Sequence, residues 1–219
     1  MIDFATIRSN PDINTYIKAA DDALLALGYT EHSFEHVSIV SHRCAEILTS
    51  LGKDQKTVEL AKIAGYMHDI GNVVNRVDHS QSGAIMAFRI LDKLGMESES
   101  IARIVSAIGN HDEGTGVPTS DISAALILAD KSDVRRSRVR TDSSLETDIH
   151  DRVNYSVEES RLVIDKEGST VSLFIEIDTS ISAIMDYFQI FLGRMQMSKS
   201  AAASLGLNFS LVINGQKLL

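Results

Sequence analysis

The feature that most constrains the fold of this chain is the helical spacing of its apolar residues from about residue 12 to residue 134. Six segments in this range carry apolar side chains three or four positions apart, which places those side chains on one face of a helix. Helix-starting residues such as Ser33 and Asp54, and helix-ending glycines such as Gly28 and Gly52, separate the segments. Because the chain has only two prolines, few positions interrupt a helix. The sequence therefore predicts a bundle of helices.

The pattern changes after about residue 140. Residues 141–151 are polar and are typical of a linker or a short irregular helix. Residues 161–165 and 169–178 have the pattern of a β-hairpin, and an apolar helical stripe follows from Ile181. We therefore expect a mainly α protein, in which a helical bundle is followed by a small α+β C-terminal domain.

The two predicted domains comprise residues 1–140 and residues 141–219. A chain of 219 residues is long enough for one medium-sized domain and a smaller companion. Near the end of the second domain, Asn214-Gly215 is a strong signal for a type I′ hairpin turn. A small sheet has exposed edges, so the C-terminal domain is a candidate for homodimer contacts.

Composition argues against several functions. The net charge of −9 disfavours general binding to nucleic-acid phosphates, which usually requires a basic surface. The chain lacks the run of about eighteen apolar residues that a membrane span requires. The single cysteine, Cys44, excludes an internal disulfide and a cysteine-based metal cluster. Since the first residues lack an apolar segment of signal-peptide length, we expect a cytoplasmic protein.

Four ionisable residues lie on apolar helix faces, where their side chains should point into the helical bundle: His36, His68, His111 and Asp130. A single histidine in such a place is usually a packed core residue, whereas a buried carboxylate without a partner costs several kcal/mol. Four such residues on four helices are best explained by a divalent metal ion, which takes neutral imidazoles as ligands and offsets the desolvation of the carboxylate.

Asp69 directly follows His68 and adds a second carboxylate. Consecutive helix residues point about 100° apart, so both can reach one ion only near a helix end. Gly71 is a plausible end of this helix, and a carboxylate there can also bridge two ions. The ligand set contains nitrogen and oxygen but no sulfur, which suits Mn²⁺, Fe, Co²⁺, Ni²⁺ or Mg²⁺ better than structural zinc. One or two ions per chain are compatible with these residues.

The order of these residues, with their local sequences, resembles the HD superfamily of metal-dependent phosphohydrolases. The matching contexts are HVSIV at His36, AGYMHDIGN around His68-Asp69 and ALILADKSD around Asp130. The resemblance covers roughly residues 30 to 138. It implies a helical fold and hydrolysis of a phosphate bond by a metal-activated water, with Asp69 as a catalytic residue.

Two further segments resemble the subset of this superfamily that has binuclear sites. They are HSQSGA, beginning at His79, and GNHDEGTGVP, which contains His111. The resemblance implies that these histidines hold a second ion with Asp69 as the bridge; alternatively, His79 only begins a helix. The chain differs from the HD-GYP phosphodiesterases of cyclic di-GMP at Asn110 and Val117. A cyclic dinucleotide phosphodiesterase is therefore an alternative that the sequence favours less.

Several polar residues near this set have open roles. Cations that follow Asp130 are candidates for phosphate contacts, because arginine and lysine bind phosphate oxygens, or they form a solvated helix end. The nearest ones come first: Lys131, Arg135, Arg136, Arg138 and Arg140. His32 is a candidate for substrate contact or a surface residue, and Asp133 can orient a water or a lysine. His42 is expected to be exposed, and His150-Asp151 to be structural.

The sequence thus predicts a metal-dependent phosphohydrolase that acts on a phosphomonoester or phosphoanhydride of a small, nucleotide-like substrate. One alternative is a catalytically silent HD domain that binds a ligand or a signalling partner. A structural metal protein is another alternative, but such sites are usually closed and rich in sulfur. The substrate, the native metal and the role of the C-terminal domain stay open at this level.

Overall fold

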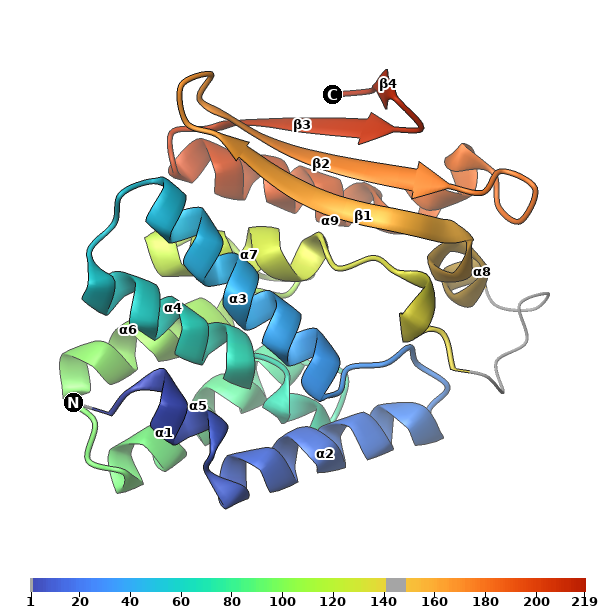
Figure 1. Cartoon of the computed structure of the whole chain (residues 1–219). Coiled ribbons are helices and arrows are strands. Elements are labelled where there is room, and N and C mark those ends of the chain that lie inside the picture. Colours follow the sequence, from blue (N-terminus) through green and yellow to red (C-terminus); the bar gives the residue numbers. More distant parts are fainter. Residues whose placement is uncertain (1, 141–148) are drawn as a thin grey trace.

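A computed structural model gives the structure of residues 2–140 and 149–219 (Figure 1). The predicted linker at 141–151 therefore lies mostly outside the described residues. The helices and 3-10 turns are α1 (Phe4–Arg8), α2 (Pro11–Ala26), α3 (Phe34–Ser50), α4 (Gln55–Met67), η1 (Ile70–Val73), α5 (His79–Lys93), α6 (Ser98–Gly109), α7 (Asp121–Lys131), η2 (Arg136–Arg138), α8 (Ile149–Ser156) and α9 (Ile184–Ser204). The strands are β1 (Val157–Asp165), β2 (Thr170–Ile177), β3 (Asn208–Ile213) and β4 (Gln216–Lys217).

Side-chain caps begin the helices that the sequence predicted. Ser33 accepts a hydrogen bond from the amide of Glu35 at the start of α3, and Asp54 accepts one from the amide of Thr57 at the start of α4. Such contacts satisfy backbone donors that have no partner inside the helix. The short helix α1 was not expected from the sequence; it packs Phe4 and Ile7 against the bundle.

Helix α7 is the centre of the bundle. Every residue from Ile122 to Ala129 is buried, because α3, α4, α6 and α9 all pack against this helix. A helix that is apolar around its whole circumference has to be surrounded in this way. Asp130 and Lys131, at the end of α7, are thereby carried into the interior. Among the described residues, no helix combines the length and apolar character needed to cross a membrane.

The C-terminal residues form a four-stranded sheet in the order β1-β2-β3-β4. The hairpin β1–β2 is antiparallel, β3 runs parallel to β2, and β4 returns antiparallel after Asn214-Gly215. The predicted inner face of β2 is confirmed, since Val171, Leu173, Ile175 and Ile177 are all buried. The predicted fold class, mainly α with a small α+β end, is also confirmed.

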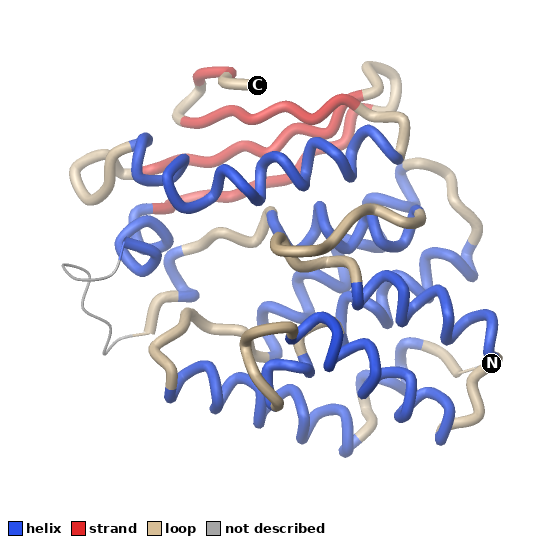
Figure 2. Tube along the Cα trace, turned by 180° about the vertical axis from the view of Figure 1, so that it is seen from behind, coloured by secondary structure: helices blue, strands red, loops and turns tan. Residues whose placement is uncertain are grey.

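Helix α9 connects β2 to β3 and lies between the sheet and α7 (Figures 1 and 2). Its first half packs Tyr187 and Phe191 under the sheet, whereas its second half places Ala201 and Ala202 in the core of the helical bundle. The two domains predicted from the sequence therefore share apolar packing along this helix. This packing determines which face of α9 lies toward the end of α7.

Two predicted apolar stripes were only partly confirmed: Leu91 of α5 and Met195 of α9 are buried, but other members of each stripe are exposed. On α5, Ile85 and Phe88 are 67% and 49% exposed, while small residues such as Gly83 and Ala84 face the bundle. On α9, the predicted Met185 also lies outside, at 73% exposure. The start of α5 packs closely against η1, and small residues such as Gly83 permit this close contact. The spacing of apolar residues in the sequence does not reveal such a contact.

Candidate metal centre

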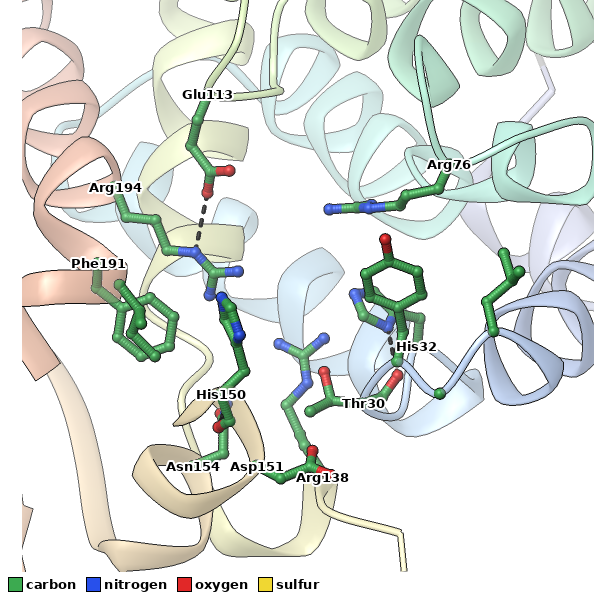
Figure 3. Close-up of a pocket in the computed structure, with 14 residues that line it drawn as sticks. Thr30, His32, Arg76, Glu113, Arg138, His150, Asp151, Asn154, Phe191 and Arg194 are labelled. Atoms are coloured by element: carbon green, nitrogen blue, oxygen red, sulfur yellow. Dashed lines mark hydrogen bonds and ion pairs between the residues drawn. The ribbon is translucent and has the colours of Figure 1, made fainter. Parts of the chain in front are cut away.

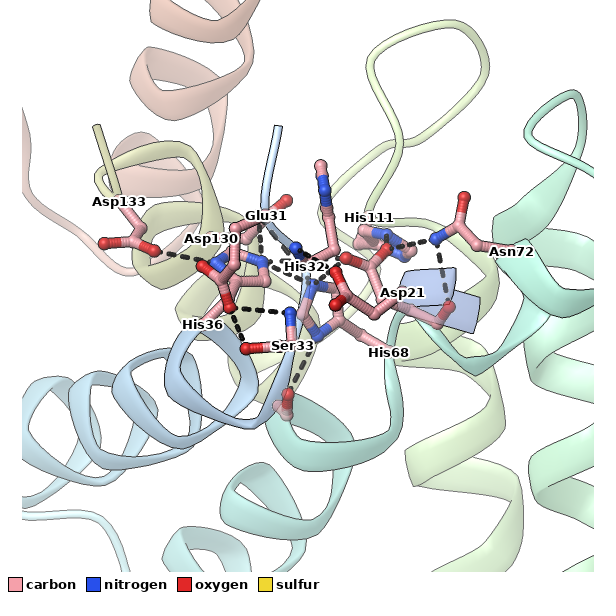
Figure 4. A network of polar contacts seen from close by, with 12 residues as sticks. Asp21, Glu31, His32, Ser33, His36, His68, Asn72, His111, Asp130 and Asp133 are labelled. Atoms are coloured by element: carbon pink, nitrogen blue, oxygen red, sulfur yellow. Dashed lines mark hydrogen bonds and ion pairs between the residues drawn. The ribbon is translucent and has the colours of Figure 1, made fainter. Parts of the chain in front are cut away.

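Four of the predicted ligands converge at one point inside the bundle: His36 near the start of α3, His68 at the end of α4, Asp69 after it, and Asp130 near the end of α7. The Nε2 atom of His36 lies 3.3 Å from Nε2 of His68 and 3.4 Å from Oδ1 of Asp130. The Oδ2 atom of Asp69 lies 3.6 Å from Nε2 of His36 and 3.3 Å from that of His68. Figure 4 shows His36, His68 and Asp130 directed toward one another.

The chain turns sharply after this histidine–aspartate pair. His68 keeps helical dihedral angles, whereas Asp69 already leaves the helix with φ −97° and ψ 1°, so that both side chains reach one point. Gly71 then lies so close to α5 that a Cβ atom would collide with the backbone of His79 and Gly83. The missing side chain at Gly71 is therefore what allows Asp69 to approach His79.

A second set of ligands meets the other oxygen of Asp69. The Oδ1 atom lies 3.5 Å from Nε2 of His79 and 3.8 Å from Nε2 of His111. These two Nε2 atoms are 3.2 Å apart. Asp69 thus directs one oxygen to each pair of imidazoles, which is the arrangement that a bridging carboxylate requires. The amide of Asn72, a residue that the sequence analysis did not single out, donates to Oδ1 at 3.0 Å and holds the carboxylate in place.

The other ring nitrogen of each histidine is occupied by an acceptor. The Nδ1 atoms lie close to these oxygens: His68 to Gly65 O at 2.8 Å, His79 to Arg76 O at 3.1 Å, His111 to Ile108 O at 2.6 Å and His36 to Asp133 Oδ2 at 2.7 Å. Because carbonyl and carboxylate oxygens only accept, each Nδ1 carries a hydrogen, so that the neutral form of each ring offers the lone pair of Nε2 to a metal ion. Two facing lone pairs cannot form a hydrogen bond, but both can bind one cation. This donor set fits a metal ion.

Both carboxylates are ionised in this setting. Burial alone would raise the pKa of Asp69, but the neighbouring His68 and His111 hold that pKa well below its usual range. Burial likewise opposes ionisation of Asp130, but Lys131 and His36 hold its pKa well below the usual range. Charged carboxylates and neutral imidazoles are the protonation states that metal ligands need.

Asp133 contacts the ligand His36, and Arg135 in turn contacts Asp133. Asp133 is buried and orients His36, rather than a water or a lysine as the sequence suggested. The Nε atom of Arg135 lies 3.1 Å from Oδ1 of Asp133, and its Nη atoms lie 3.0 Å from carboxylate oxygens of Glu31 and Glu35. The charge of Arg135 is directed at these carboxylates and away from the cavity beside the centre, which does not favour the phosphate contact predicted for it.

A cavity of about 470 Å³ lies beside the metal ligands (Figure 3). It is lined by both parts of the chain, including Thr30, His32, Arg76, Glu113 and Arg138 from the bundle and His150, Asp151, Asn154, Phe191 and Arg194 from the C-terminal part. A smaller pocket directly over the ligands shares His32, Arg76, Arg138 and Arg194 with this cavity. The cavity therefore opens onto the metal centre.

The remaining predicted residues divide between the cavity and the surface. Lys131 lies at the centre, with Nζ 2.7 Å from Oδ2 of Asp130. Arg136 and Arg140 are bonded elsewhere, to the carbonyl of Tyr155 and the carboxylate of Asp21, so Arg138 is the arginine of this segment that lines the cavity. His42 is exposed, as predicted.

Part of the cavity wall was not predicted from the sequence. His150 and Asp151 were expected to be structural, but both line the cavity. Arg76, Glu113 and Arg194 were not singled out, and they come from three separate segments. For Arg76 there was a weak signal, its place three residues before His79, whereas a single arginine on an amphipathic helix such as α9 gives none.

Comparisons with known proteins show the family to which the chain belongs. The HD domain family model matches residues 33–153. The chain is 27% identical over 207 residues to the uncharacterized protein MJ1020 of Methanocaldococcus jannaschii, covering 84% of this chain and 78% of that protein. It is 27% identical over 134 residues to ribonuclease Y of Bacillus pumilus, covering 61% of this chain but only 24% of the ribonuclease.

Among solved structures, the chain is similar to a predicted HD superfamily hydrolase from an uncultured Thermotogales bacterium. The identity is 26% and the TM-score 0.46, over 57% of this chain and 67% of the other. The family model is the decisive finding, because it spans more than half of the chain and its matched range contains all six predicted metal ligands. The chain therefore belongs to the HD domain family.

Proposed function

We propose that this protein hydrolyses a phosphomonoester or phosphoanhydride bond of a small, nucleotide-like substrate at a centre of two divalent ions. The observation that carries the proposal is the position of Asp69, whose two oxygens face two separate pairs of imidazoles. A structural metal site is usually closed by one set of ligands, and a second set beside the first is not expected there. A cavity lined by arginines next to these ligands supports an anionic substrate.

In this proposal His36, His68, Asp69 and Asp130 hold one ion, and His79, His111 and Asp69 hold the other. Divalent ions supply a Lewis acid for phosphoryl oxygens and lower the pKa of water to near neutrality. The absence of sulfur ligands favours manganese, iron, cobalt or nickel over zinc, and magnesium is also compatible.

Side chains of the protein itself would contribute positive charge and would orient the substrate. Lys131 is buried next to Asp130, and although burial alone would lower its pKa, Asp130 and Glu113 raise that pKa, so the ammonium group stays charged. A fixed positive charge there stabilises the negative charge that develops on a phosphoryl group. Arg138 and Arg76 line the route to the ligands and are suited to bind phosphate oxygens. Asp69, which faces both pairs of imidazoles, would hold both ions and would in this way orient the attacking water.

The proposal is tested with the full chain, stripped by a chelator and reloaded with Mn²⁺. We expect metal-dependent release of phosphate or of a phosphorylated product from at least one member of a panel of nucleoside mono-, di- and triphosphates, with p-nitrophenyl phosphate as a generic ester. A protein that binds Mn²⁺ stoichiometrically but hydrolyses no member of the panel would contradict the proposal and favour the catalytically silent alternative.

A further inference from the structure

The cavity wall carries several positively charged side chains, and one of them, Arg194, lies away from the candidate metal ligands. This residue comes from α9, in the C-terminal part of the chain, and lines both the large cavity and the pocket over the metal ligands. Its Nε atom lies 2.9 Å from Oε1 of Glu113, and its guanidinium carbon lies 4.4 Å from the centre of the Phe191 ring. Figure 3 shows the guanidinium group directed into the cavity, opposite Arg76 and His32.

Arg194 and Lys131 contact the same carboxylate oxygen of Glu113. The Oε1 atom of Glu113 that accepts from Arg194 is also 3.2 Å from Nζ of Lys131. Lys131 in turn contacts the metal ligand Asp130. Lys131 therefore lies beside the candidate metal ligands, and Arg194 lies on the other side of one Glu113 oxygen. Adjacent phosphoryl groups, which share one bridging oxygen, can span such a pair.

Arg138 lines the same two pockets as Arg194. It is buried, and it uses Nε and Nη1 to donate to the carbonyl oxygens of Glu31 and Asp133. Within residues 2–140 and 149–219, its Nη2 atom has no hydrogen-bond partner, and the residue lines the cavity beside Arg194. Burial lowers the pKa of Arg138, and the positive charge of Arg194 adds to this effect although Asp133 opposes it. Because Arg138 and Arg194 line the same two pockets, an anion bound there would be attracted by both charges.

We infer that Arg194, supported by Arg138, binds a phosphoryl group adjacent to the one that reacts, so that the protein prefers substrates with at least two linked phosphoryl groups over monophosphates. This inference rests on the proposed phosphohydrolase function and narrows its substrate class to phosphoanhydrides. It also gives the C-terminal part of the chain a role in specificity, since α9 supplies the residue.

The test compares two probes that the protein cannot hydrolyse, methylenediphosphonate and methylphosphonate, by calorimetry on the Mn²⁺-loaded full chain. The wild-type protein is expected to bind the diphosphonate at least about tenfold more tightly. Arg194→Ala should lose most of this preference while its affinity for methylphosphonate changes less than about twofold, because one charge-assisted contact is removed from one position only. The matched control is Arg161→Ala, which removes an exposed arginine of β1 outside the cavity and should change neither affinity.

Arg194→Lys keeps the charge and most of the length of the side chain, and it is expected to retain part of the preference even if the alanine variant is unstable. An unchanged preference in the folded Arg194→Ala protein would overturn the inference, as would an equal loss of affinity for both probes. Hydrolysis of the substrate panel is measured in parallel. A protein with the preference but without turnover contradicts only the proposed function, whereas turnover without the preference contradicts only this inference.

Discussion

Asp133 accepts a hydrogen bond of 2.7 Å from Nδ1 of His36, and this contact fixes which nitrogen of the imidazole faces the metal centre. Replacing a hydrogen-bond partner behind a metal-bound histidine typically weakens metal affinity by about tenfold to a hundredfold. We expect Asp133→Ala to have an effect of this size, measured by competition with a chelator. Asp22→Ala, in an exposed ion pair on α2, is the control. An affinity within about twofold of wild type would mean that Asp133 does not orient the ligand.

Asp69 is the residue common to both sets of ligands, and its loss should be more severe. We expect Asp69→Ala to reduce turnover at least about a thousandfold, which corresponds to roughly 4 kcal/mol in the activation barrier. The helical circular dichroism should be retained, because the side chain faces the ligands and not the apolar core. Asp92→Ala, at an exposed position on α5, should leave turnover unchanged. Turnover within about threefold of wild type would exclude a catalytic role for Asp69.

The close contact at Gly71 is needed to bring the two sets of ligands together. A Cβ atom there meets backbone atoms of His79 and Gly83, which cannot move away as a flexible side chain would. We expect Gly71→Ala to lower the free energy of unfolding by roughly 1–3 kcal/mol and to weaken metal binding. Gly193→Ala is the matched control, since its added methyl group meets no atom within 4 Å on α9. Equal stability of the two variants in urea denaturation would contradict this explanation.

The sequence contained enough information for the fold class and for the cluster of ionisable residues at the candidate metal centre. His36, His68, His111 and Asp130 could be found because each places an ionisable group on a face that is otherwise apolar, a pattern visible within one helix. The cavity wall could not be found in this way. Arg76, Glu113 and Arg194 lie in segments whose own patterns are ordinary, and only the packing of α9 against α7 brings them together. The outward stripe of α5 was misassigned for a related reason: helix periodicity identifies an apolar face but not the neighbour that a helix packs against.

The metal-free protein should lose stability in mildly acidic solution through His79. Burial lowers the pKa of this imidazole from its usual 6.5 to about 4. Between these pH values the unfolded chain binds a proton that the folded chain does not, so the free energy of unfolding decreases as the pH falls through this window. Between pH 7 and pH 5, wild type should lose roughly 1–2 kcal/mol more than His79→Gln. Denaturant titrations at both pH values check this, and an equal loss in the two proteins would show that His79 is not the group responsible.

Metal content tests most directly whether two sets of ligands share Asp69. Elemental analysis of the Mn²⁺-loaded full chain should give about two ions for wild type and about one for the His79→Ala, His111→Ala double variant, because His36, His68, Asp69 and Asp130 still complete the first site. His42→Ala, which removes an exposed histidine, should keep two. Two ions in the double variant, or no more than one in wild type, would contradict the account.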